Sequence, residues 1–65
     1  MKYFIDAHRK PSASTVFVAI DSTSCYCPIG QHSEMDETYT KDCREITKEQ
    51  YIKYAGDLYT PQEYL

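Results

Sequence analysis

The chain has to build its core from very few aliphatic side chains. Isoleucine, leucine and valine together supply nine of the 65 residues, whereas tyrosine supplies seven and phenylalanine two. A chain of this length buries only about 60% of the surface that its unfolded form exposes, so each large apolar side chain matters for stability. We therefore expect aromatic rings to provide much of the buried area, and we expect tyrosine to be a structural residue first.

Three segments in the first 30 residues have the pattern of β-strands. Residues 2–8 alternate their side chains with a period of two, and residues 15–21 are apolar on both faces, which predicts a central strand. Residues 24–30 can pair back as a third strand that places Cys25 and Cys27 on one face. Pro28 cannot donate to a strand ladder, so this strand should lie at an edge or end there. Short polar turns separate the segments, and the order predicts an antiparallel meander.

A helical spacing replaces the strand pattern after Gly30. Met35, Tyr39, Cys43 and Ile46 are spaced by four, four and three residues, which predicts a helix over about 34–46. Thr47 followed three residues later by Gln50 forms a capping box and predicts a helix over 48–55, with a short helical turn after Thr60.

These elements predict one small α+β domain over residues 1–65. Its fold is a three-stranded antiparallel β-meander followed by one or two C-terminal α-helices packed on one face of the sheet. Residues 1–30 form the sheet half in this prediction, and residues 31–65 form the helical half.

The cysteines and one histidine allow a metal hypothesis. A tetrahedral zinc site would take three thiolates and one imidazole, from Cys25, Cys27, His32 and Cys43. The spacing of the first two cysteines is tighter than the usual zinc knuckle, and free cysteine also behaves as a small apolar residue. The favoured interpretation is that the cysteines serve the fold and that no cofactor is bound, with zinc as the minority hypothesis.

The same side chains could be read as a cysteine nucleophile activated by histidine. Nothing in the sequence orients a histidine toward Cys25 or Cys27, and 65 residues leave little room for a substrate cleft beside a core. No glycine-rich phosphate loop and no hydrolase or metalloprotease motif occurs. We expect the protein not to be an enzyme.

Charge is distributed unevenly along the chain. The net charge is −3, and residues 11–40 contain four carboxylates but no lysine or arginine. Binding to nucleic acid draws on lysine and arginine that neutralise phosphates, so direct DNA or RNA binding is disfavoured and a protein partner with a basic surface is favoured.

Exposed tyrosines beside carboxylates are typical of the anchors and rims of protein interfaces. The alternative interpretation of the acidic run is an ordinary solvated helix face. The candidate partner-binding residues are Glu34, Asp36, Glu37, Tyr39, Asp42, Glu45, Tyr51, Tyr54, Tyr59 and Tyr64.

Two absences in the sequence bear on the compartment. No apolar run approaches the roughly 20 residues that cross a bilayer, and the first residues lack the apolar region of a signal peptide. The odd number of cysteines also favours reduced thiols. We expect a cytoplasmic protein that does not bind a membrane.

In length, mild acidity, tyrosine content and its opening MKYF, the chain resembles the small accessory proteins of bacteriophages and mobile elements. Anti-CRISPR and other anti-defence proteins are examples, and many of them bind one host enzyme and block it. The resemblance covers no motif and transfers no site residue. It implies a non-enzymatic inhibitor of a host nucleic-acid enzyme or defence system, acting in the host cytoplasm. The alternatives are a zinc-stabilised structural or adaptor domain and a self-associating part of a larger assembly.

Overall fold

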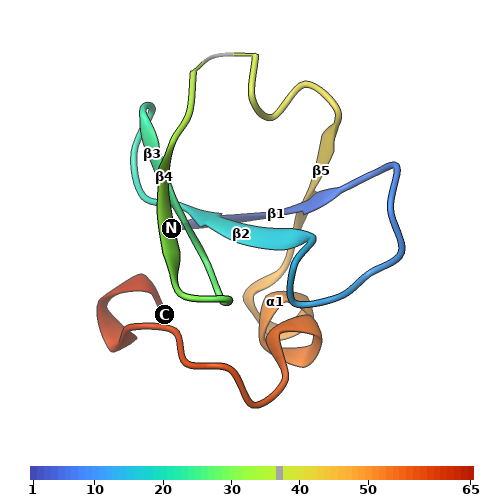
Figure 1. The fold of residues 1–65 in the computed structure, drawn as a ribbon, viewed down its shortest axis with the longest axis vertical. Coiled ribbons are helices and arrows are strands. Elements are labelled where there is room, and N and C mark those ends of the chain that lie inside the picture. Colours follow the sequence, from blue (N-terminus) through green and yellow to red (C-terminus); the bar gives the residue numbers. More distant parts are fainter. Residues whose placement is uncertain (37) are drawn as a thin grey trace.

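The computed structural model describes residues 1–36 and 38–65, which form five strands, one α-helix and one short 3₁₀ helix (Figure 1). The strands make one antiparallel sheet in the order β4-β3-β2-β1-β5. The elements in chain order are β1 (Lys2–Asp6), β2 (Val16–Ala19), β3 (Ser24–Cys27), β4 (Gln31–Glu34), β5 (Cys43–Ile46), α1 (Lys48–Ala55) and η1 (Gln62–Tyr64).

The three N-terminal strands lie where the sequence predicts them. β2 is the central strand of the sheet, and its first three residues are all buried, as its two apolar faces predict. β3 ends at Cys27, directly before Pro28. Gly30 then adopts a φ of 90° in a tight turn whose amide bonds the carbonyl of Cys27 at 2.9 Å, and the chain reverses into β4.

The predicted fold class is nevertheless wrong. The described residues form a five-stranded sheet and not a three-stranded meander. The error is the expected helix over 34–46: β4 ends at Glu34, and β5 occupies Cys43–Ile46. Residues 31–34 and 43–46 therefore belong to the sheet and not to a helical half. The domain is mostly β, and the described residues contain one α-helix, α1.

Local hydrogen bonds explain why the described residues between these strands are not helical. The Asp36 carboxylate accepts from the backbone amide and the hydroxyl of Thr38, at 2.9 and 2.6 Å, and the amides of Lys41 and Cys43 bond carbonyls three residues earlier. Such side-chain and turn bonds compete with helical ones. The four-four-three spacing is coincidental, because Ile46 packs in the core beneath α1 while Cys43 pairs with Asp6 on the other face.

The helix α1 begins and ends as its sequence predicts. The Thr47 hydroxyl accepts from the Gln50 amide at 3.1 Å, the Gln50 side chain accepts from the Thr47 amide at 3.0 Å, and Gly56 ends the helix with a φ of 63°. α1 covers one face of the sheet (Figure 1), where it closes the main core. That core consists of Tyr3, Ile5, Val16, Val18, Ile46, Tyr51 and Ala55.

Tyrosine hydroxyls hold the C-terminal segment against this side of the molecule. The hydroxyl of Tyr3 donates to the carbonyl of Tyr64 at 2.8 Å, and that of Tyr26 donates to the carbonyl of Tyr59 at 2.9 Å. The hydroxyls of Tyr51 and Thr60 lie 2.8 Å apart. Much of the tyrosine content thus has a structural role. The helical turn expected after Thr60 is present as the 3₁₀ helix η1.

None of the helical segments in residues 1–36 and 38–65 is long and apolar enough to cross a membrane.

Candidate partner-binding face

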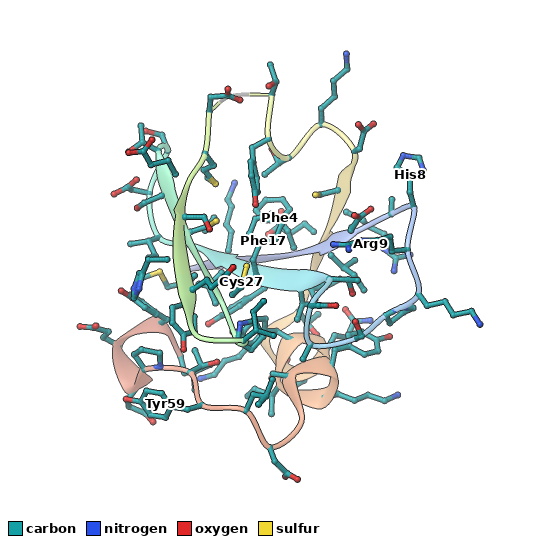
Figure 2. All side chains as sticks on the ribbon, in the orientation of Figure 1. Phe4, His8, Arg9, Phe17, Cys27 and Tyr59 are labelled. Atoms are coloured by element: carbon teal, nitrogen blue, oxygen red, sulfur yellow. The ribbon has the colours of Figure 1, made fainter. Side chains whose placement is uncertain are left out.

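The sheet face opposite α1 is covered by residues 35–36 and 38–42 of the connection between β4 and β5, and we call it the loop-covered face. Side chains that alternate outward from four strands lie on it, including Phe4 of β1 and Phe17 of β2. Figure 2 shows these two rings beneath the connection, whereas Tyr59 lies on the far side of the sheet with the C-terminal segment.

An aromatic row runs across this face. The rings of Phe4 and Phe17 stack at a centroid distance of 5.6 Å, and Tyr39 meets Phe17 edge-on at 5.3 Å. Phe17 is buried, but 41% of Tyr39 is exposed. Desolvation and the neighbouring cysteine side chains raise the pKa of Tyr39 to about 12. Its phenol therefore stays protonated at neutral pH, and Tyr39 fixes the loop to the sheet while offering part of its ring to solvent.

The three cysteines lie on the same face, and all three are free thiols. Cys25 is fully buried, and burial raises the pKa of the thiols of Cys25, Cys27 and Cys43. A protonated thiol is a poor nucleophile. Cys25 thus packs as a small apolar residue, and Cys43 lies on β5 and not on the predicted helix.

His32 is separated from these thiols by the sheet. It pairs with Tyr26 across β3 and β4, its ring lies 4.9 Å from that of Tyr26, and its Nε2 is 3.1 Å from the Tyr64 hydroxyl. The proposed zinc set of Cys25, Cys27, His32 and Cys43 is thus not assembled. Across the described parts of the chain, no three histidine, cysteine or acidic side chains are grouped so as to hold a metal ion.

Exposed carboxylates surround the loop. Glu34 precedes it on β4, where the strand register places it on the same face as His32; Asp36 and Asp42 lie within it, and Glu45 follows it on β5. The pairing of Ser24 with Glu34, and a 2.8 Å bond from the Met35 amide to the Thr23 carbonyl, bring the turn that carries Asp21 next to the same segment. We call this set the acidic rim; it comprises Asp21, Glu34, Asp36, Asp42 and Glu45. Glu37 lies outside the described residues.

Hydrogen bonds from neighbouring groups keep part of the rim ionised. The amide and hydroxyl of Thr23 lower the pKa of Asp21, and the hydroxyl and amide of Thr38 lower the pKa of Asp36. Among the described residues, Asp42 is the rim carboxylate with an ion-pair contact, at 3.7 Å from His8 Nε2. The rim therefore carries more carboxylates than cations, since Lys41 and Arg44 are the basic residues beside it in sequence.

The structure brings one of the five candidate tyrosines to this rim. Tyr39 lies within it, whereas Tyr51 is fully buried in the main core and offers no surface to a partner. Tyr54 and Tyr64 are half-buried against that core, and Tyr59 is 73% exposed on the C-terminal segment. The candidate tyrosines therefore do not form one surface.

Two pockets flank the segment that contains Tyr39 and Thr40. The larger, of about 440 Å³, is lined by Met1, Lys2, Phe4, Ala19, Ile20, Asp21, Ser22, Met35 and Thr40. The smaller, of about 290 Å³, is lined by Asp6, His8, Arg9, Phe17, Tyr39, Asp42 and Cys43. We call the smaller one the Tyr39 pocket.

Sequence reasoning missed the contributions of Phe4, Phe17, Asp6 and Asp21 to this face. The sequence pattern could have revealed the two phenylalanines, because side chains in a strand alternate between faces and each phenylalanine alternates with the core residues of its strand. No comparable signal links Asp6 or Asp21 to the loop, because those proximities depend on strand pairing between distant segments.

Comparison with protein-family models, with curated proteins and with solved structures finds no match to this chain.

Proposed function

We propose that the protein is a non-enzymatic binding module that uses the acidic rim and Tyr39 to bind a basic surface of another protein. The observation that carries the proposal is the combination of exposed carboxylates with a half-exposed, neutral tyrosine that is fixed in place. Tyr39 is held by edge contact with the buried Phe17 ring, so little side-chain entropy remains to be lost on binding.

Aromatic anchors surrounded by polar groups are typical of interfaces between proteins, and tyrosine is enriched among the residues that dominate binding energy. Carboxylates around such an anchor select partners by charge and accelerate encounter with a positive surface. The rim also disfavours a phosphate backbone as the ligand, because its charge has the same sign.

The partner class follows from the same charge argument. Enzymes that act on nucleic acids carry basic surfaces that receive phosphates, and a negative rim can occupy such a surface in their place. Occupancy would exclude the nucleic acid, so the proposed consequence is inhibition. The proposal places the protein in the host cytoplasm, as its resemblance to phage accessory proteins implies.

Affinity capture from bacterial lysate with matched charge variants tests this function. The test variant is Glu34→Gln/Asp36→Asn/Glu45→Gln, which removes three rim charges. The control variant is Glu49→Gln/Asp57→Asn/Glu63→Gln, which removes three exposed charges from α1 and the C-terminal segment.

We expect wild type and control to retain the same basic protein at low salt and the test variant to lose it. High salt should weaken the interaction, since it screens exposed charges. Equal retention by both variants would contradict the proposal. If the capture recovers only further copies of this chain, and its molar mass in solution is doubled, self-association is favoured instead.

A further inference from the structure

The Tyr39 pocket has the chemical features of a site for one positively charged, planar side chain. Its aromatic wall consists of Phe17 and Tyr39, and Tyr39 is the more exposed of the two rings. A guanidinium group stacks on an aromatic face more readily than an ammonium group does, because it is planar and weakly hydrated.

Backbone pairing fixes the acidic side of the pocket. Asp6 pairs with Cys43 across β1 and β5, and the Ala7 amide donates to the Asp42 carbonyl at 3.1 Å. These bonds hold Asp42 beside the end of β1. Asp6 is thus placed by the sheet itself, and the backbone of Asp42, the last residue of the connection, is tied to the end of β1.

One of the two carboxylates already binds a guanidinium from the same chain. Asp6 accepts from Arg9 Nε at 3.0 Å and from the His8 amide at 2.8 Å, and Arg9 also donates from Nη2 to the Ser14 carbonyl at 3.3 Å. The His8 amide, with help from Arg9, lowers the pKa of Asp6. Asp6 is thus ionised and occupied.

Asp42 is the carboxylate that an incoming group can use. Its side chain is 77% exposed, and its ion-pair contact in the described chain is His8 Nε2 at 3.7 Å, a distance beyond that of a direct hydrogen bond. Figure 2 shows His8 at the outer end of β1, projecting from the body of the sheet. Asp42 is therefore available without breaking a bond that the fold depends on.

We propose that the Tyr39 pocket binds an arginine side chain of the partner, with the guanidinium over the Tyr39 ring and paired with the Asp42 carboxylate. The inference rests on the proposed function, because it names the basic residue that the rim receives. At about 290 Å³ the pocket is at or below the size of ordinary small-molecule sites, which suits one long side chain.

A titration of the isotope-labelled 65-residue chain with short peptides, monitored by the NMR chemical shifts of its amides, tests the inference. The probe is acetyl-Gly-Arg-Gly-amide, compared with the same peptide carrying lysine and with one carrying citrulline, a neutral isostere of arginine. We expect shifts centred on residues 39–43 and on His8, with millimolar affinity for arginine, at least about fivefold weaker affinity for lysine, and none for citrulline.

Asp42→Asn should weaken arginine binding by at least about fivefold, whereas Asp57→Asn, an equal change on the C-terminal segment, should leave it unchanged. Tyr39→Leu should weaken it as well, and far-UV circular dichroism would establish that the variant is folded. Equal affinity for the three peptides, no shift at residues 39–43, or an unaltered affinity in Asp42→Asn would overturn the inference.

The two proposals fail in different ways. If a captured partner is lost by the three-charge rim variant and by Tyr39→Leu but bound normally by Asp42→Asn, the function stands and the arginine pocket is wrong. If the arginine peptide binds as described but no basic protein is captured, the pocket stands and the proposed function is wrong.

Discussion

The free energy of unfolding of Tyr51→Phe tests whether the Tyr51 hydroxyl stabilises the fold. The Tyr51 ring is fully buried and lies 5.2 Å from that of Tyr3, and its hydroxyl is 2.8 Å from Thr60 Oγ1. The substitution keeps the ring and removes one hydrogen bond between α1 and the C-terminal segment. A lost bond of this kind costs about 1 kcal/mol net, and up to about 2 kcal/mol when its partner is left unsatisfied.

That loss is large for a chain of 65 residues, whose whole stability is expected to be about 3–10 kcal/mol. Urea unfolding followed by circular dichroism measures it directly. With a slope of about 1 kcal/mol per molar urea, the midpoint should fall by about 1–2 M. Tyr51→Ala would add a cavity and cost about 3–5 kcal/mol, enough to unfold much of the population.

Tyr59→Phe is the matched control, because Tyr59 is 73% exposed and uses its backbone carbonyl, not its hydroxyl, to accept from Tyr26. Its midpoint should change by less than about 0.5 M, the range of ordinary surface substitutions. If Tyr51→Phe were as stable as wild type, or if Tyr59→Phe were equally destabilised, the structural role assigned to the Tyr51 hydroxyl would be refuted.

Three other changes test separate parts of the structure. Thr47→Ala removes the hydroxyl that caps α1 and should cost about 0.5–2 kcal/mol in urea unfolding; Thr47→Ser, which keeps the cap, should cost much less. Cys25→Ser places a hydroxyl at a fully buried position and should cost about 1–3 kcal/mol, whereas exposed Ser22→Ala should be nearly neutral. Alkaline pH should destabilise the fold. Burial raises the pKa of the Cys25 thiol above 9.0 and that of Tyr39 from 10.0 to about 12. The stabilisation that these groups give is complete below their pKa values in the unfolded chain and is lost as the pH rises through their pKa values in the folded chain. Unfolding measured across that range should show a weaker pH dependence in Tyr39→Phe, and an unchanged dependence would contradict the assignment.

The sequence predicts those parts of the fold that depend on neighbouring residues. The alternation in 2–8 and 15–21, the stop at Pro28 and the capping box at Thr47 each have a local physical cause, and each is confirmed. The helix over 34–46 failed because a spacing of four, four and three is also compatible with a turn followed by a strand. What decides is the pairing of Tyr3 with Ile46 across 43 residues of sequence, which no local pattern contains.

The candidate site was predictable in part for the same reason. The acidic run and Tyr39 are close in sequence, and the structure places them around one loop. Tyr51 and Tyr64 could not be separated from Tyr39 by composition, since only the tertiary fold decides which ring is buried. The separation of His32 from the cysteines likewise depends on strand register, which sends alternate residues to opposite faces.

Amide hydrogen exchange of the protein bound to its captured partner tests the central claim most directly. The account predicts slowed exchange in residues 34–36 and 38–45 and at the Asp21 turn, with residues 56–65 unchanged. Slowed exchange confined to residues 56–65, with the loop between β4 and β5 unaffected, would contradict it.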